Sequence, residues 1–344
     1  MSTIISPVQS GTGALWRTSR RPTKGINWFK CAPFIGLHVA CLAAFLTGVN
    51  ATALALCGLT YFLRMFGITA GYHRYFSHRS YKTSRLGQFV LACLGCSALQ
   101  KGPLWWAAHH REHHRYSDRP GDPHSPHETN FWWSHVGWIL SEEYDETPCD
   151  EVRDWLAYPE LRWLDRYHWL PGILLAGLCL LIGGWVGLVW GFVISTVLVY
   201  HATFTINSLS HLIGTRRYQT DDDSRNNLFL ALITLGEGWH NNHHHFRSSA
   251  NQGFYWWEID ISFTVLRVLR LAGLVWDVRT PGAKALAHRL IRSPCSTAPA
   301  GQRTAHLSSR LDGGATGVSP NPDDSPQRTQ RNAEVKPERG SDDS

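Results

Sequence analysis

Residues 170–199 read LPGILLAGLCLLIGGWVGLVWGFVISTVLV and contain no Asp, Glu, Lys or Arg. They lie inside a run of 49 residues without these charges, from Tyr167 to Thr215. A second such run of 33 residues extends from Cys31 to Leu63. Since one membrane-spanning helix takes about 20 predominantly apolar residues, each run is long enough for a tight pair of helices.

Two short segments that contain glycine divide these runs. Gly48-Val49-Asn50 can turn the first pair of helices, and Gly183-Gly184 can turn the second. We therefore expect an all-α integral membrane fold with four transmembrane helices in two hairpins, rather than the core helices of a soluble protein. The expected spans cover about residues 32–49, 51–70, 168–186 and 188–210.

Composition and charge agree with a membrane protein. Because 43% of the residues are hydrophobic, a wholly disordered chain is excluded, and only 17% are charged, against about 25% in soluble domains. The net charge of +6 reflects basic flanks of the spans and does not imply nucleic-acid binding. Positive charge next to spans marks the cytoplasmic side. It is carried by Arg17, Arg20, Arg21, Lys24 and Lys30 before the first span, and by Arg74, Arg79, Lys82 and Arg85 after the second.

An even number of spans puts both termini and the segment 67–166 together on this cytoplasmic side. Arg outnumbers Lys 27 to 6, which favours a bacterial inner membrane over the endoplasmic reticulum. Residues 1–25 are expected to be a flexible tail and residues 26–290 the membrane domain. Residues 291–344 are rich in Ser, Pro, Gly, Asp and Arg, which predicts a disordered C-terminal tail.

Ten of the 19 histidines fall in three short clusters on the predicted cytoplasmic side. The clusters read YHRYFSH at 72–78, HHREHH at 109–114 and HNNHHH at 240–245. Residues at i, i+3 and i+4 share one face of a helix. This spacing groups His110, His113 and His114 on one face, and His240, His243 and His244 on another.

The remaining histidines of the clusters do not fit these faces. His109 and His245 point away from them. His73 and His78 are five residues apart, so they cannot share a face of an α-helix and are expected to bracket a site or to lie where a helix ends.

Imidazole is a common ligand of Zn, Cu, Fe and Ni, and eight converging imidazoles suit two ions better than one. The sequence has no HExxH motif, which disfavours a zinc protease. His38, His168 and His201 lie in or near spans without the paired pattern of a membrane haem.

The set HxxxxH, HxxHH and HxxHH, arranged around two apolar hairpins, resembles the integral-membrane fatty acid desaturases. The flanking words are similar to those of the acyl-CoA Δ9 (stearoyl-CoA-type) desaturases, in a bacterial-like form without a fused cytochrome b5 domain. The resemblance runs from about Ile26 to Asp277. The words are Gly67-Ile-Thr-Ala-Gly71, Ser77-His-Arg-Ser-Tyr81, Asp122-Pro-His124, Ser134-His-Val-Gly-Trp138, Asn207-Ser-Leu-Ser-His211 and Gly236-Glu-Gly-Trp-His240.

The resemblance implies four spans under a cytoplasmic helical cap that holds a di-iron site. Taken alone, His211 would be an isolated interfacial histidine, but the family makes it a ligand. The family's asparagine, which holds a metal through water, falls on Asn207. The family's nine histidine ligands fall on His73, His78, His110, His113, His114, His211, His240, His243 and His244.

The resemblance also implies an activity. It is the O2-dependent insertion of a cis double bond, at position 9, into a saturated acyl chain carried by CoA. The cofactors would be two Fe2+ ions, which form the catalytic centre, with O2 as co-substrate. The chain has no cytochrome b5, rubredoxin or ferredoxin motif, so a separate protein of one of these types, with its reductase, is expected to supply electrons.

The expected head-group site departs from the animal enzymes of the family. Ala108-His109 replaces an Arg-Asp pair, and the acidic segment Ser141-Glu-Glu-Tyr-Asp145 stands where a basic pair contacts CoA. Arg74, Arg111 and Arg115 remain as candidates for contact with the head group. Acyl-CoA is still expected, with a phospholipid ester or acyl carrier protein as the alternative carrier.

Three other functions stay open at this point. A membrane di-iron lipid hydroxylase would use the same scaffold. A transporter or channel is disfavoured, because the two charge-free runs lack the ionisable residues of a transport path. A noncatalytic relative is disfavoured, because no position of the ligand set is missing.

Overall fold

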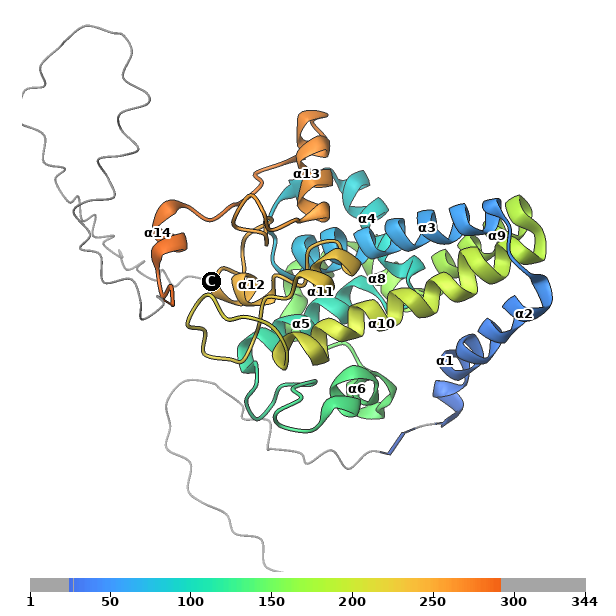
Figure 1. The fold of residues 1–344 in the computed structure, drawn as a ribbon, viewed down its shortest axis with the longest axis horizontal. Coiled ribbons are helices and arrows are strands. Elements are labelled where there is room, and N and C mark those ends of the chain that lie inside the picture. Colours follow the sequence, from blue (N-terminus) through green and yellow to red (C-terminus); the bar gives the residue numbers. More distant parts are fainter. Residues whose placement is uncertain (1–24, 27, 292–344) are drawn as a thin grey trace, which may run out of the picture. The chain divides into compact units, whose positions relative to one another are not determined.

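The computed structural model describes residues 25, 26 and 28–291. The two predicted tails lie outside the described residues, apart from Gly25 and Ile291. Within the described part the fold is helical, except for one two-stranded antiparallel sheet in which β1 (Lys82–Thr83) pairs with β2 (Val275–Trp276). Figure 1 shows long helices that run together on one side and shorter helices that gather at their other end.

The first hairpin turns where the sequence predicts. Its first arm consists of α1 (Trp28–Ala40), a short 3-10 turn (Cys41–Ala43) and α2 (Ala44–Thr47). Gly48 then adopts a positive φ of 65°, which costs glycine little. The Asn50 side chain accepts a hydrogen bond of 2.8 Å from the Ala53 amide and thereby caps α3 (Ala51–Phe66).

The second hairpin also turns at its predicted glycine. Inside α9 (Leu170–Leu188), Gly184 has φ 60° and ψ −155°, and the chain reverses there. It returns through η6 (Val189–Ile194), α10 (Ser195–Ser208) and η7 (Leu209–His211). The Trp190 indole donates a hydrogen bond of 2.8 Å to the Gly48 carbonyl. The two turns therefore lie side by side at the same end (Figure 1).

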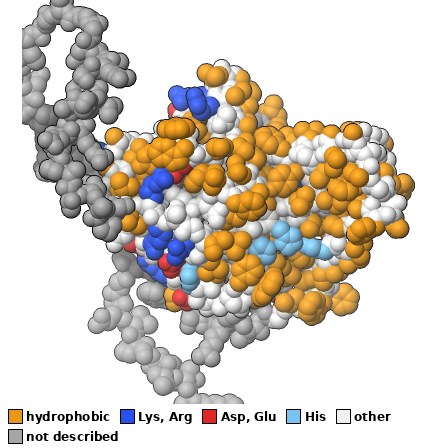
Figure 2. Space-filling model, viewed as in Figure 1, with side chains coloured by type: hydrophobic (Ala, Val, Ile, Leu, Met, Phe, Trp, Pro, Cys, Tyr) orange, Lys and Arg blue, Asp and Glu red, His pale blue; other side chains and the backbone are white. Residues whose placement is uncertain are grey.

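Two helical segments are long and apolar enough to cross a membrane, Ala51–Ser77 and Leu170–His211. The second includes the reversal at Gly184. Cys31–Thr47 is apolar but shorter. Figure 2 shows hydrophobic side chains spread over the hairpin end of this face. The count of four spans is not fixed by these lengths and stays a prediction.

One charge lies inside the hairpins. The Arg64 side chain has no exposed surface. It donates hydrogen bonds to the Thr60 carbonyl at 3.1 Å and to the hydroxyls of Thr196 and Ser195, each at 2.5 Å. Because a buried cation needs full hydrogen bonding, these contacts fasten α3 to the second hairpin.

The remaining residues form what we call the cap, residues 67–166 and 209–291. The cap begins with the π-helix η2 (Gly67–Ser77). Its longer helices are α4 (Arg85–Ser97), α5 (Pro103–Tyr116), α8 (Pro159–Arg166) and α13 (Ile261–Leu271). Its shorter helices are η3 (Trp133–Gly137), α6 (Trp138–Leu140), η4 (Glu142–Tyr144), η5 (Cys149–Val152), α7 (Arg153–Leu156), α11 (Leu228–Ile233), α12 (His240–His245) and α14 (Ala283–Ala287).

Close packing holds η2, which continues directly from α3, against α4. A Cβ atom on Gly67 would lie 2.5 Å from the Leu94 carbonyl carbon and 2.6 Å from the Gly95 nitrogen. Only glycine therefore lets η2 and α4 approach this closely. Further along η2, the buried Arg74 guanidinium forms ion pairs with Glu237 at 3.1 Å and Asp260 at 3.0 Å. These contacts hold η2 against the segments that follow the second hairpin.

Candidate metal centre

Four segments that are far apart in the sequence carry the nine candidate histidine ligands. They are η2 with the residue after it, α5, η7 and α12. Helix α5 starts at Pro103, and Asp165 accepts hydrogen bonds of 3.0 Å from the amides of Leu104 and Trp105. A carboxylate at the N-terminus satisfies free amides and fixes the orientation of the helix.

The π-helix explains how His73 and His78 meet. A π-helix bonds residues i and i+5. The His78 amide donates to the His73 carbonyl at 3.2 Å, and the two Nε2 atoms are also 3.2 Å apart. The expectation that these residues cannot share a face assumed an α-helix and does not hold for η2. The expectation that His78 lies where the helix ends is correct.

Five histidines form a first group, in which one nitrogen of each lies within 4.8 Å of the others. Their Nε2 atoms converge. Those of His78 and His110 are 2.9 Å apart, and the His243 Nε2 is 2.8 Å from that of His114 and 3.0 Å from that of His73. The members are His73, His78, His110, His114 and His243.

Four histidines form a second group by the same criterion, and all four are buried. The Nε2 atoms of His211 and His240 are 3.0 Å apart, whereas the buried Nε2 atoms of His113 and His244 have no hydrogen-bond partner. The members are His113, His211, His240 and His244. The two groups together contain the nine histidines that the family resemblance selects.

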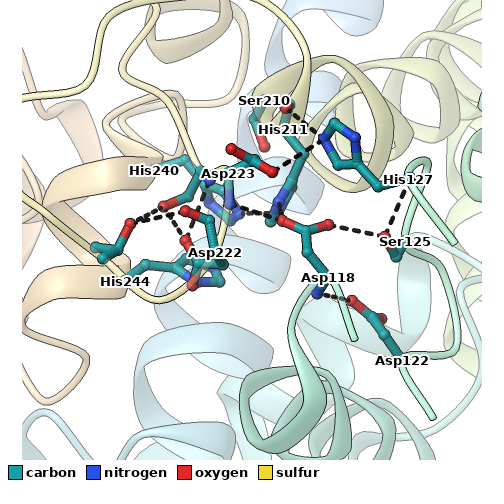
Figure 3. Close-up of polar contacts among 12 residues, drawn as sticks. Asp118, Asp122, Ser125, His127, Ser210, His211, Asp222, Asp223, His240 and His244 are labelled. Atoms are coloured by element: carbon teal, nitrogen blue, oxygen red, sulfur yellow. Dashed lines mark hydrogen bonds and ion pairs between the residues drawn. The ribbon is translucent and has the colours of Figure 1, made fainter. Parts of the chain in front are cut away.

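Four of the nine rings are oriented by carboxylates, which contact their Nδ1 atoms. Glu237 contacts His73 at 2.6 Å and Asp122 contacts His113 at 3.0 Å. Asp118 contacts His211 at 2.7 Å and Asp222 contacts His244 at 2.6 Å (Figure 3). Such contacts favour a proton on Nδ1, so each of these rings, in its neutral form, presents an unprotonated Nε2 to the centre.

This tautomer makes the centre suitable for cations. Two unprotonated Nε2 atoms cannot hydrogen-bond to each other, and the Nε2 of His113 and that of His244 have no protein donor at all. A buried acceptor without a donor is costly. A metal ion at each group would satisfy these lone pairs, since neutral imidazole is the ligand form of histidine.

The electrostatics of the cap also favour the neutral form of six of the nine rings. Burial, and next the charge of neighbouring imidazoles, lowers the pKa well below its ordinary value for His78, His110, His114, His240 and His243. Burial lowers the pKa of His244 to about 4, although Asp222 opposes this shift. Burial would raise the pKa of Asp122, but the neighbouring His113 outweighs it and brings the pKa to about 2. The carboxylate therefore stays ionised.

His109 and His245 lie outside both groups, as their helical positions predict. The His109 ring contacts the Glu146 carbonyl at 3.2 Å, and the His245 ring contacts the Ala285 carbonyl at 2.7 Å. Asn207 is half-buried and lines a cavity of about 40 Å³ together with His73, His110, His113 and His240.

The arginines selected for the head group already have partners. Arg74 is fully buried against Glu237 and Asp260, which argues against its predicted contact with a head group at the cap surface. Arg111 pairs with Asp154 at 2.9 Å, and Arg115 pairs with Glu151 at 2.5 Å.

A larger cavity of about 550 Å³ leads away from the centre. It shares Trp106, His110, His124, Thr203 and Asn207 with the small cavity. Its wall is mainly apolar, with Phe34, Leu37, Trp105, Leu140, Tyr200 and Phe204. Lys101, Glu142, Asp145 and His168 also line it, and the Lys101 ammonium is paired with Asp145.

The carboxylates were not identified from the sequence. Asp122 and Glu237 stand inside words that the family shares, but nothing in their spacing assigns them to a particular ring. Asp118 and Asp222 are 93 and 22 residues from their histidines. Only the folded chain brings these pairs together.

Comparison with known proteins gives the centre a context. The sequence profile of a family described as fatty acid desaturase matches residues 50–267. An sn-1 stearoyl-lipid 9-desaturase of Anabaena variabilis is 38% identical over 271 residues, which cover 78% of this chain and 98% of the relative. An acyl-CoA 5-desaturase of Anemone leveillei is 40% identical over 255 residues, covering 72% of this chain and 77% of the relative. A hex-5-enoyl-acyl-carrier-protein acetylenase of Moorena producens is 36% identical over 282 residues, covering 76% and 88%.

Proposed function

The chain belongs to the fatty acid desaturase family, and from this premise we propose that it inserts a cis double bond into a saturated acyl chain with O2, at two iron ions held by its nine clustered histidines. The observation that carries this proposal is the pair of buried histidine groups. Asn207 is proposed to hold one ion through water, as in the sequence expectation.

The substrate explains why the centre takes metals. A methylene group in an acyl chain has no acidic hydrogen, so a general base cannot start the reaction, and bound iron supplies the oxidising chemistry with O2. The residues of the protein position the metal ligands and shield the reacting carbons from water. Carboxylates hold the imidazoles in place, and burial of the rings excludes water from the reacting carbons.

The larger cavity is the proposed acyl site. Its volume of about 550 Å³ lies within the range of about 300–1,000 Å³ that small-molecule sites occupy. Its apolar wall suits a hydrocarbon chain. Gln100 donates a hydrogen bond of 3.1 Å to Thr203 in this wall, beside Trp106 and His110, where the two carbons would be held.

We propose position 9 for the double bond and CoA as the carrier, with the four-span topology and cytoplasmic cap in a bacterial inner membrane. Two relatives named for position 9 support the first choice. A lipid-linked acyl chain is the second candidate for the carrier. It is favoured by the few charged residues of the cavity wall, where Glu142 and Asp145 accompany a single lysine that is already paired.

Metal and product analysis test the central proposal. Purified protein should contain two irons per chain, and cells that express it should convert deuterated stearate into a deuterated cis monoene. His243→Ala is the inactive control. A single zinc in active protein would contradict the di-iron proposal, and a deuterated hydroxy acid in place of the monoene would make the chain a hydroxylase.

A charge reversal tests the carrier. If CoA is the carrier, Glu142→Lys with Glu143→Lys should lower the KM for stearoyl-CoA at low salt, because like charges near a phosphate weaken binding. If membranes containing stearoyl phospholipid are desaturated while stearoyl-CoA is ignored, the lipid-linked candidate replaces CoA.

A further inference from the structure

The proposed reaction needs electrons from outside, and this inference rests on that function. Formation of one double bond removes two electrons and two protons from the acyl chain. Reduction of one O2 to two waters takes four electrons and four protons. Two electrons and two protons must therefore come from elsewhere, the electrons from two molecules of a reduced one-electron carrier, each of which is oxidised by one electron.

One loop of the cap lies between the surface and the second histidine group. Asp222 points inward and contacts the His244 Nδ1 at 2.6 Å. The amide of Asp223 donates a hydrogen bond of 2.9 Å to Asp118, which in turn contacts the His211 Nδ1 at 2.7 Å (Figure 3). Asp221 points outward and its side chain is 71% exposed. Segment 221–223 thus has one side chain in solvent, while its next two residues contact His244 and the carboxylate that orients His211.

Guanidinium groups surround the outer side of this loop. Arg119 donates to the Asp221 carbonyl at 3.3 Å, and Arg289 pairs with the Asp221 carboxylate at 3.3 Å. Arg216 pairs with Asp223 at 3.1 Å. Arg247 is exposed at its surface, and its guanidinium feels the charges of the nearby Asp222 and Asp221, which partly oppose the lowering of its pKa by burial. We call Arg119, Arg216, Arg247 and Arg289 the arginine patch.

The patch has an excess of positive charge. At its outer side, four arginines accompany two outward carboxylates, those of Asp221 and Asp223, whereas Asp118 and Asp222 point inward to histidines. The other arginine-rich part of the cap has a smaller excess, with five arginines and four carboxylates. There, Arg79, Arg85, Arg111, Arg115 and Arg153 pair with Asp150, Glu151, Asp154 and Glu160.

From this juxtaposition we propose that the arginine patch is the docking surface for the electron donor, an acidic protein that carries one electron, and that loop 221–223 is the path from the donor to the second histidine group. Charge complementarity selects the donor and speeds its encounter with the patch. The loop then gives a bonded connection from the patch to His244, through Asp221, Asp222 and the 2.6 Å contact.

The test uses the whole purified protein and a reduced plant-type two-iron, two-sulfur ferredoxin, which is acidic, as the donor. The double variant Arg119→Glu with Arg247→Glu should raise the KM for this ferredoxin at low salt by about tenfold or more. The KM for the acyl substrate and the iron content should not change. The matched control is Arg153→Glu, since Arg153 is an exposed arginine outside the patch and pairs with Asp150.

Salt and direct binding complete the experiment. The difference between the wild-type protein and the double variant should shrink as salt is raised, because surface charges are screened. An unchanged KM for the ferredoxin, or an equal rise in Arg153→Glu, would overturn the proposal. Binding of the ferredoxin is also measured without turnover. Salt-sensitive binding that depends on the patch would support the docking surface even if no desaturated product forms. The lack of product would then count against the proposed function alone.

Discussion

At the scale of single residues, the centre depends on carboxylates as much as on histidines. Asp222 contacts the His244 Nδ1 at 2.6 Å and is itself held by the Ser224 hydroxyl at 2.6 Å. Loss of such a carboxylate lets the imidazole turn and changes its tautomer. The neighbouring Asp221 has no contact with a histidine of either group.

Asp222→Asn should therefore weaken metal binding by about 10–100-fold while the protein remains folded. Retention of iron against a graded chelator measures this, with Asp221→Asn as the matched control, which should bind iron as the wild type does. Equal losses in both variants would show that the loop, and not the carboxylate, is responsible.

Substitutions of single histidines test which of them belong to the metal centre. His110→Ala, His114→Ala, His240→Ala and His244→Ala should abolish desaturation, because each removes a converging nitrogen. His109→Ala and His245→Ala should keep part of the activity, since their rings contact backbone carbonyls outside the groups. Product analysis in whole cells measures all six. Complete loss in all of them would contradict the assignment.

The residue scale also shows how far the sequence could lead. Spacing within α5 and α12 was sufficient to select six histidines as candidate ligands, because both segments are helical as expected. It did not divide them between the two groups. His211 came only through the family resemblance, since no second histidine lies near it in the chain. Asp118 and Asp222 could not be assigned, because their contacts depend on loops whose conformation no spacing rule describes.

At the scale of elements, the close approach of η2 to α4 holds the start of the cap in place. It depends on Gly67, where an added Cβ would meet backbone atoms that cannot rotate away. Gly58 lies in α3 with no atom within 4 Å of an added Cβ. The two glycines therefore form a matched pair.

Gly67→Ala should destabilise the protein by about 1–3 kcal/mol through overpacking. Gly58→Ala should be neutral or slightly stabilising, because alanine is the better helix former. Thermal unfolding in detergent, followed by circular dichroism, measures both. A Tm for Gly67→Ala equal to that of Gly58→Ala would contradict the close approach.

The elements also show where pattern reading fails. Both hairpin turns could be predicted from their glycines, because glycine readily adopts the positive φ that these turns need. The π-helix η2 could not be predicted in this way. Its hydrogen bonds join residues i and i+5, whereas the prediction of helix faces assumed the α-helical period. This one element changes the relation between His73 and His78.

At the scale of the whole molecule, the proposed topology puts the cap and both termini on the cytoplasmic side. Cys149 lies in η5 of the cap and is exposed, whereas the cysteines of the hairpins are buried or half-buried. A membrane-impermeant thiol reagent should therefore reach Cys149 from one side only.

In a Cys295→Ser background, the reagent should label Cys149 in inside-out vesicles and not in right-side-out vesicles. Cys149→Ser provides the unlabelled control, and mass spectrometry locates the label. Labelling in right-side-out vesicles alone would reverse the proposed orientation of the cap.

The order of the four histidine segments along the chain has a consequence for biogenesis. The first group needs His243, and the second needs both His240 and His244. All three lie in α12, which leaves the ribosome after both hairpins have been synthesised. Both hairpins are therefore synthesised before either histidine group is complete, and under the proposed function iron binds only after α12 has been made. A chain truncated before residue 240 would still carry both hairpins and would have no complete site for iron.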